Sequence, residues 1–316
     1  MKVVYITGCL GFIGTYVTEA CLARGWKVYG VDKITYASNK HMLNVFEKDE
    51  NFKFIKKDIC NLKRLNDCDY IINTAAESHV GNSIVDSTEF IRSNVQGTKN
   101  LLDLIRHKQS NCVDPPVFFQ FSTDEVYGDI NEGFHVETDY LKPSNPYSAT
   151  KAAADMLVLA WARTYGINYI LFRPTNNYGK RQYHEKLIPI SVRNLSWNKK
   201  IKLHNAGSPV RNWLHAYDTA EAVLAVIDSG KCNEIYNVAG GYEEKNAEVV
   251  RKIIHAYHGT DRNWKDYVDL DYIRVGQDVR YALDDSKLKS LGWTPKKIFD
   301  EEVVKVVDAL RDNFSW

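Results

Sequence analysis

The stretch that decides the fold reads Val3-Val4-Tyr5-Ile6-Thr7-Gly8-Cys9-Leu10-Gly11-Phe12-Ile13-Gly14. Its first five residues form an apolar run that predicts a buried strand, and an apolar helical pattern follows as far as Arg24-Gly25. The glycines at positions 8, 11 and 14 allow a tight turn, close approach to a pyrophosphate and close packing of helix on strand. The helix would present free N–H groups and the positive end of its dipole to the phosphates. The stretch therefore predicts a dinucleotide-binding unit.

Four further apolar runs extend this unit. They cover residues 27–31, 52–56, 70–74 and 117–121 and alternate with helical patterns. Such alternation predicts an α/β fold, a doubly wound parallel sheet of the Rossmann type.

The ends of these runs carry residues suited to NAD. Asp32 ends the second strand, where a carboxylate accepts hydrogen bonds from the ribose hydroxyls and repels the 2′-phosphate of NADP. Lys33 directly after it weakens that preference. Small residues, Thr74, Ala75 and Ala76, would let a cofactor approach the fourth strand closely. We therefore predict NAD as the cofactor.

Composition excludes several classes of function. The 316 residues include 41 Lys and Arg against 40 Asp and Glu, so neither a nucleic-acid partner nor a membrane partner is expected. No apolar run approaches the ~18–20 residues that span a bilayer, and the first residues do not resemble a signal peptide. Six scattered cysteines are expected to be reduced, and neither they nor His255 and His258 predict a metal site. These features indicate a cytoplasmic protein of enzyme size.

Two pairs of polar residues stand where α/β folds place their chemistry. Asp124 and Glu125 follow the run 117–121, and adjacent acids at a strand end suggest an acid and a base with separate tasks, although a solvated turn is the alternative. Tyr147 and Lys151 stand four residues apart, at the start of a predicted helix over residues 148–165. A neighbouring ammonium would lower the pKa of the phenol, as a base requires. After a dinucleotide loop, this Tyr-x-x-x-Lys pair is identified as the signature of extended short-chain dehydrogenases/reductases.

The chain resembles nucleoside-diphosphate-glucose 4,6-dehydratases along nearly its whole length. The segments that carry the resemblance are Gly11-Phe12-Ile13-Gly14, Asp32-Lys33-Ile34-Thr35-Tyr36, Ala75-Ala76-Glu77-Ser78-His79-Val80, Ser122-Thr123-Asp124-Glu125-Val126-Tyr127-Gly128, Tyr147-Ser148-Ala149-Thr150-Lys151, Asn176-Asn177-Tyr178-Gly179, Glu185-Lys186-Leu187-Ile188-Pro189, Arg211-Asn212-Trp213-Leu214 and Arg280-Tyr281-Ala282-Leu283-Asp284. The Thr-Asp-Glu triplet distinguishes dehydratases from the related 4-epimerases, which lack an acid pair there.

The resemblance implies a lyase that converts a nucleotide-activated glucose into its 4-keto-6-deoxy derivative and regenerates NAD in each turnover. Tyr147, with Lys151, would remove the C4 hydroxyl proton while NAD takes the C4 hydride, and Thr123 would hydrogen-bond that hydroxyl. Glu125 would then take the C5 proton. Protonated Asp124 would donate to the departing C6 hydroxyl, and the hydride would return to C6.

The resemblance also implies the binding residues. For NAD they are Gly8, Gly11, Phe12, Ile13, Gly14, Asp32, Lys33, Thr35, Asp58, Ile59, Thr74, Ala75, Ala76, Ser78, Asn94, Tyr147, Lys151 and Asn177. For the nucleotide-sugar substrate they are Ser78, Thr123, Asn176, Glu185, Lys186, Leu187, Lys202, His204, Arg211, Asn246 and Arg274. Asn246 could equally be only a helix N-cap.

Two departures from the family pattern bear on the substrate. Arg274 is followed by Val-Gly-Gln in place of the more familiar Pro-Gly-His. His204 stands where bacterial thymidine-nucleotide enzymes usually carry Tyr and where eukaryotic relatives carry His. The second departure favours UDP-glucose over dTDP-glucose.

The expected organisation is two lobes and two chains. We predict an NAD-binding Rossmann domain over residues 1–175 and a smaller mixed α/β nucleotide-sugar-binding lobe over residues 176–316, with some segments interchanged. The resemblance implies a homodimer paired through helices at residues 88–107 and 148–165. Apolar residues of the second helix fit that pairing or a core equally: Met156, Leu157, Leu159 and Trp161.

Two rival functions share this fold. One is a nucleotide-sugar 4-epimerase or decarboxylase, in which the acid pair would be missing or would have no role. The other is a catalytically silent NAD-binding protein, which would be expected to lose Tyr147, Lys151 or the acids.

Overall fold

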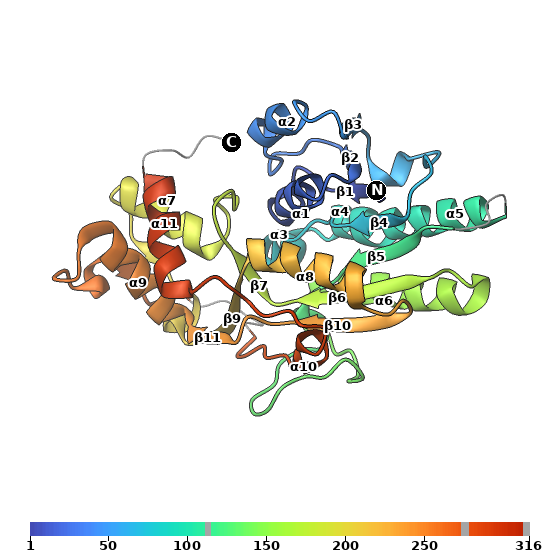
Figure 1. Cartoon of the computed structure of the whole chain (residues 1–316). Helices are drawn as coiled ribbons and strands as arrows, with labels where there is room; N and C mark the ends of the chain where they lie inside the picture. The colour runs from blue at the N-terminus through green and yellow to red at the C-terminus, as the bar shows by residue number, and fades with distance from the viewer. Residues whose placement is uncertain (111–114, 273–277, 312–316) are drawn as a thin grey trace.

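A computed structural model of the chain describes residues 1–110, 115–272 and 278–311. Seven strands form the main sheet: β1 (Val3–Thr7), β2 (Lys27–Asp32), β3 (Phe52–Lys56), β4 (Tyr70–Asn73), β5 (Val117–Phe121), β6 (Tyr169–Pro174) and β10 (Glu234–Val238). All pair in parallel, in the order β10-β6-β5-β4-β1-β2-β3 (Figure 1). The strand order reverses between β1 and β4, so the predicted doubly wound sheet is confirmed.

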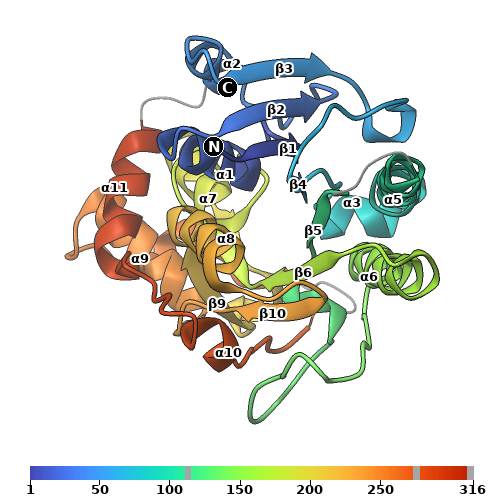
Figure 2. The same cartoon turned by 45° about the vertical axis from the view of Figure 1, so that its right-hand side comes forward.

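Helices cover both faces of this sheet. One face carries α1 (Phe12–Ala23) and α8 (Ala216–Ser229), and the other carries α5 (Gly97–Gln109) and α6 (Pro146–Tyr165) (Figure 2). Shorter helices lie in the connections: α2 (Lys40–Phe46), α3 (Val80–Val85) and α4 (Thr88–Phe90). Both faces are therefore buried, which explains why the strands read as continuous apolar runs in the sequence.

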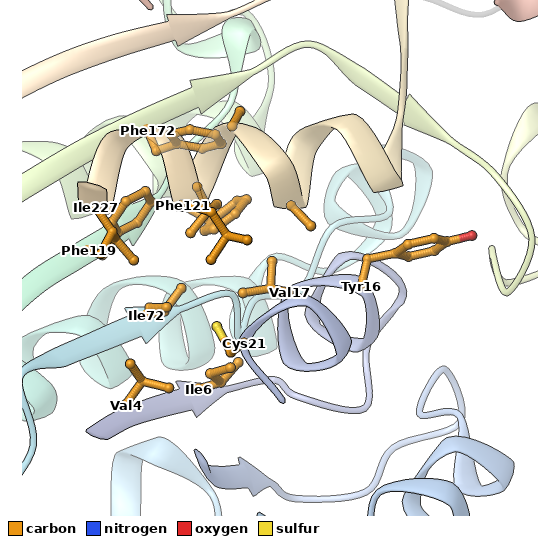
Figure 3. Close-up of a cluster of buried hydrophobic side chains, with 14 of the residues drawn as sticks. Val4, Ile6, Tyr16, Val17, Cys21, Ile72, Phe119, Phe121, Phe172 and Ile227 are labelled. Carbon is orange, nitrogen blue, oxygen red and sulfur yellow. The ribbon is translucent and has the colours of Figure 1, made fainter. Parts of the chain in front are cut away.

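The core between the sheet and its first helical layer includes side chains from the central strands and from α1 and α8. Figure 3 shows Val17 and Cys21 of α1, and Ile227 of α8, beside apolar side chains of β1, β4, β5 and β6. Val4, Ile6, Ile72 and three phenylalanines (Phe119, Phe121 and Phe172) are the labelled strand residues. This packing fixes the carboxyl ends of the central strands in a rigid frame.

A smaller lobe of mixed sheet and helices completes the molecule. Its strands are β7 (Asn176–Tyr178), β8 (Ile201–Lys202), β9 (Val210–His215), β11 (Tyr242–Lys245) and β12 (Val268–Asp269), and its helices are α7 (Leu187–Ser196), α9 (Asn246–His258) and α11 (Phe299–Arg311). β9 pairs antiparallel with β11 and parallel with β7. The chain returns to the main sheet at α8 and β10 and packs α10 (Ser286–Lys289) against β10. The domain boundary between residues 175 and 176 stays a prediction.

The expected helix over residues 88–107 is interrupted. A π-helical turn, Ile91–Gln96, separates α4 from α5 and brings Ser93 into the wall of the cleft described below. In α6, Met156 is 48% exposed, whereas Leu157, Leu159 and Trp161 pack against the core. In the part of the chain that the structure describes, no helix is long and apolar enough to cross a membrane.

Candidate active site

The carboxyl ends of β1, β4, β5 and β6 open into a cleft, as expected beside the switch point of a doubly wound sheet. The cleft holds about 1630 Å³ of empty space when its open mouth is included. Its lining runs from the glycine loop to the acid pair, so the residues expected to bind the cofactor and those expected to bind the substrate share one cleft.

The glycine loop forms a cradle at the start of α1. Gly8 has a φ of +70°, and a Cβ there would lie 2.7 Å from the main chain of Ala75. A Cβ at Gly14 would collide with the Gly8 carbonyl oxygen. Gly11 is the N-cap of α1 and no side chain caps the helix, so the end of its dipole faces the cleft. This arrangement fits a pyrophosphate, as the sequence predicted.

Three hydrogen bonds fix the orientation of the Asp32 carboxylate at the end of β2. Its carboxylate accepts hydrogen bonds from the Leu10 N–H (3.1 Å), the Ile34 N–H (2.8 Å) and the Ser38 hydroxyl (3.0 Å). A carboxylate has about four lone-pair sites, so it can still accept from a ribose hydroxyl. The free acceptor sites of Asp32 and the glycine cradle together fit NAD.

Most residues expected to bind the cofactor line this cleft. They are Gly8, Gly11, Phe12, Ile13, Gly14, Asp32, Lys33, Thr35, Asp58, Ile59, Thr74, Ala75, Ala76, Ser78, Tyr147, Lys151 and Asn177. Asn94 lies behind the wall, where its amide bonds the main chain of Glu77 and the hydroxyl of Thr150. Asn94 therefore holds the wall rather than facing the cleft.

The acid pair follows β5 on a short 3₁₀ turn, Asp124–Val126. Asp124 is 3% exposed and its oxygens contact two hydroxyls, those of Thr123 (3.0 Å) and Thr175 (2.9 Å). Burial raises the pKa of Asp124. Burial and the neighbouring Asp124 raise the pKa of Glu125 to about 7. The first residue is therefore suited to hold a proton, and the second to accept one near neutral pH.

Asn145 connects Glu125 to the start of α6. Its side-chain oxygen caps the helix by accepting from the Ser148 N–H (2.9 Å), and its amide N–H donates to Glu125 Oε2 (3.2 Å). One side chain thus fixes both the helix that carries Tyr147 and the predicted base.

Tyr147 and Lys151 both lie in the cleft wall, but not as the predicted pair. Lys151 Nζ donates to the main-chain carbonyl of Phe121 at the end of β5 (2.5 Å), and burial lowers the pKa of Lys151 to about 8. Burial, followed by the charge of Glu125, raises the pKa of Tyr147. The predicted lowering of the tyrosine pKa by Lys151 is therefore absent from the described structure, because the ammonium turns toward the strand end.

A charged pair lies beneath the acid pair. Arg173 Nε contacts Asp155 Oδ2 at 3.0 Å, and the Ser122 hydroxyl donates to the same oxygen at 3.0 Å. Arg173 also donates to the Tyr127 hydroxyl (2.7 Å), whose own proton goes to the side-chain oxygen of Asn237. This network supports the ends of β5, β6 and β10 from below.

Several expected substrate residues line the other half of the cleft: Ser78, Thr123, Asn176, Glu185 and Lys186. Asn176 Oδ1 is buried without a hydrogen-bond partner, which suits it to a ligand. Lys186 donates to the carbonyl of Ser78 (2.7 Å).

The lining residues that the predicted site lacks include Tyr36, Thr175 and Tyr183. Tyr36 donates to Glu185 (3.2 Å), and its ring meets that of Tyr183 at a centroid distance of 5.3 Å. Thr175 could have been found, because it directly follows the apolar run Tyr169-Ile170-Leu171-Phe172 of β6, which ends at the carboxyl edge of the sheet.

The remaining expected substrate residues lie outside the lining of this cleft. The Arg211 guanidinium donates to the carbonyls of Val210 (2.7 Å) and Asp278 (3.0 Å). Lys202 and His204 both lie against the ring of Tyr272. Leu187, Asn246 and Arg274 complete the set: Leu187 packs against the smaller lobe's core, Asn246 is the first residue of α9 after the N-cap Lys245, and Arg274 lies outside the described residues. Asn246 is therefore not the cap. Among the described residues, no three His, Cys, Asp or Glu side chains gather as a metal site.

The fold, the glycine cradle and the Tyr147–Lys151 helix define an extended short-chain dehydrogenase/reductase. The sequence pattern of the GDP-mannose 4,6 dehydratase family matches residues 5–306, and the chain belongs to that family. The predicted family resemblance is thereby confirmed.

Individual relatives agree over the full length. A probable dTDP-glucose 4,6-dehydratase of Sinorhizobium fredii is 37% identical, covering 99% of this chain and 94% of its own. The crystal structure of a dTDP-glucose 4,6-dehydratase from Streptomyces venezuelae, with NAD bound, has a TM-score of 0.92 at 34% identity, covering 98% of this chain and 97% of its own. A UDP-glucose 4-epimerase of Thermus thermophilus, also with NAD, has a TM-score of 0.85 at 25% identity, covering 98% and 99%.

Proposed function

We propose that the protein is a hydro-lyase, an NAD-dependent 4,6-dehydratase of a nucleotide-activated glucose. The observation that carries the proposal is the acid pair Asp124 and Glu125, which lies in one cleft with Tyr147 and the glycine cradle. The names of the relatives support the same reaction, and the solved relative supports NAD.

The glycine cradle and Asp32 would hold the cofactor. NAD, when bound, supplies the group that accepts the hydride from sugar C4 and returns it to C6. The free N–H groups at the start of α1 would bind its pyrophosphate, and the carboxylate of Asp32 would bind its ribose.

The side chains of the cleft would move three protons. Tyr147 Oη, once ionised, takes the proton of the C4 hydroxyl, and Thr123 orients that hydroxyl. The positive charge of oxidised NAD in the cleft would oppose the rise in the Tyr147 pKa that burial causes. The resulting 4-ketone acidifies the C5 proton, which Glu125 removes. Asp124 gives its proton to the C6 hydroxyl, the C6–O bond breaks and water leaves. Glu125 then returns its proton to C5. Tyr147 ends with one proton more and Asp124 with one fewer, and solvent exchange restores both.

The two rival functions on this fold give the acid pair no catalytic role. A 4-epimerase needs hydride transfer at C4 and no proton removal at C5. A silent NAD-binding protein needs no base with a pKa near neutrality, yet the pKa of Glu125 is raised to about 7. Perturbed groups converging in a cleft favour catalysis.

The nucleotide base is a separate proposal. Preference for UDP-glucose rests on His204, which lies against Tyr272 at a ring-centroid distance of 4.9 Å. The relatives' names support dTDP-glucose instead. Rejection of one methyl group is worth only ~1–3 kcal/mol, so turnover of both substrates is expected. The homodimer and the cytoplasmic location also stay predictions.

Proton NMR of products, after separate incubations with UDP-glucose and dTDP-glucose and no added NAD, tests the proposal. A C6 methyl doublet is the expected result, and the ratio of the two rates settles the base. A galactose-configured product would make the protein an epimerase. No reaction with either sugar, even with NAD supplied, would favour the silent alternative.

A further inference from the structure

We propose that Thr175 is a positioning residue for the acid Asp124, and that its hydroxyl turns between two partners as Asp124 loses and regains its proton. This proposal deepens the proposed dehydratase function and rests on it. Thr175 follows the last residue of β6 and is 4% exposed. It is absent from the site that the sequence predicted.

Two acceptor oxygens compete for the single proton of this hydroxyl. Thr175 Oγ1 lies 2.9 Å from Asp124 Oδ2 and 3.0 Å from the main-chain carbonyl oxygen of Asn212. A carbonyl oxygen can only accept. While Thr175 donates to Asn212, its contact with Asp124 is a hydrogen bond only if Asp124 carries a proton and donates it.

The other oxygen of Asp124 has a fixed partner. Thr123 Oγ1 accepts from the Glu125 N–H (3.3 Å) and donates to Asp124 Oδ1 (3.0 Å). Because its proton is used at Oδ1, the transferable proton of Asp124 belongs on Oδ2, facing Thr175. The two threonines thus differ in this arrangement: Thr123 donates to the acid, and Thr175 can accept from it.

The reversal follows from the acid step. As the C6–O bond breaks, the proton of Asp124 joins the leaving hydroxyl to form water, and the electron pair released at C5 forms the C5–C6 double bond. Asp124 is left as a carboxylate in a site that is 3% exposed. Its Oδ2 then needs a donor, since a buried charge without hydrogen bonds is strongly disfavoured. The Thr175 hydroxyl can turn from Asn212 to Oδ2 by rotation about one bond, with every heavy atom in place.

A pair of matched variants tests this role. Thr175→Val keeps the shape and removes the hydroxyl, and Thr175→Ser keeps the hydroxyl. With a nucleotide-glucose that the wild type dehydrates, we expect reduced cofactor to form within about threefold of the wild-type rate in both variants. Because hydrogen bonds to charged groups are the stronger ones, product with a C6 methyl should form about 10–100-fold more slowly in Thr175→Val and near the wild-type rate in Thr175→Ser. Reduced cofactor should therefore accumulate only in Thr175→Val.

A double-mutant cycle adds a second readout. Asp124→Asn removes the acid, so Thr175→Val added to it should slow product formation no further. Wild-type rates in Thr175→Val would overturn the proposal. Equal slowing of both steps would also overturn it, because the hydroxyl would then only support the fold. If Thr175→Val does not fold, Thr175→Ala is compared with Thr175→Ser by the same criteria. An inactive wild type would overturn the proposed function itself, and with it the acid role of Asp124.

Discussion

Two groups of carboxylates flank the end of β5, and they differ in the charge of their hydrogen-bond partners. Asp155 faces the guanidinium of Arg173 at 3.0 Å, with both residues at most 1% exposed. Among the described residues, the side chains that donate hydrogen bonds to Asp124 and Glu125 are neutral: they are the hydroxyls of two threonines and the amide of Asn145.

This difference bears on which carboxylate can exchange a proton. Burial raises the pKa of all three carboxyl groups, but at Asp155 the permanent charge of the Arg173 guanidinium is the strongest influence opposing that rise. The hydrogen bonds that oppose the effect of burial at Asp124 and Glu125 come from neutral side chains. One strand end thus carries a structural ion pair below and two groups able to transfer protons above. Four expected outcomes test that division, from the largest effect to the smallest.

Removing the base should have the largest effect. In Glu125→Gln, Tyr147 can still take the C4 proton, but no carboxylate can take the C5 proton. General base catalysis is typically worth ~10²–10⁴-fold, and we expect product formation to fall by that factor while reduced cofactor accumulates. Stopped-flow absorbance and product NMR together measure the two steps. Glu301→Gln, the same change on the exposed face of α11, is the control and should leave both steps unchanged. Full turnover by Glu125→Gln would remove Glu125 from the base role.

Breaking the ion pair should act on stability instead. Asp155→Asn leaves Arg173 buried and unpaired, and losses of about 3–5 kcal/mol in the free energy of unfolding are typical for such a change. Urea unfolding measures it. Replacing both partners, as Asp155→Leu with Arg173→Met, should recover most of the loss. A loss below about 1 kcal/mol in the single variant would show that the pair does not behave as a buried one.

The comparison also separates what the sequence could predict from what it could not. The cradle from Val3 to Gly14 was predictable because its constraints are local: the period of apolar residues, and glycines where a Cβ would collide. The parallel, doubly wound arrangement of the sheet followed from the alternation of strands and helices. The alternation also locates the carboxyl ends of the parallel strands, where the ligand-binding side chains of the site lie.

The partners of the acids were not predictable from local pattern. Glu125 is hydrogen-bonded to Asn145, 20 residues further along the chain, and Asp124 to Thr175, 51 residues further along. Both contacts therefore depend on packing across the sheet. The four-residue spacing correctly put Tyr147 and Lys151 on one helix. It could not show that the ammonium would turn to the carbonyl of Phe121, since that choice depends on where β5 ends.

A pH series should separate the two groups of carboxylates by stability. The pKa of Glu125 rises from 4.5 to about 7 on folding, so between these values the folded protein binds more protons than the unfolded chain. The free energy of unfolding therefore receives its full contribution from Glu125 below about pH 4.5 and loses it as the pH rises through about 7. Because Glu125 is partly exposed, we expect the loss to be roughly 1–3 kcal/mol.

Urea unfolding of wild type and Glu125→Gln, from about pH 5 to about pH 8, measures this contribution by difference. The free energy of unfolding of Glu125→Gln should rise relative to that of the wild type as the pH rises. The deficit of Asp155→Asn should change less over the same range, because the charge of Arg173 opposes the protonation of Asp155. Parallel curves for wild type and Glu125→Gln would mean that Glu125 does not titrate near neutrality.

The smallest expected effect comes from one atom of the α6 cap. Asp caps a helix about as well as Asn, so Asn145→Asp should keep the bond to the Ser148 N–H and change the free energy of unfolding little. It replaces the N–H that donates to Glu125 at 3.2 Å by a second carboxylate oxygen. Like charges raise a carboxyl pKa, so the acid limb of the pH–rate profile for product formation should move up by about one unit. Asn145→Ser, which keeps a capping oxygen and adds no charge, should move it less. An acid limb that stays in place in Asn145→Asp would show that the neutral partners of Glu125 do not set its pKa, and the contrast with Asp155 would then rest on burial alone.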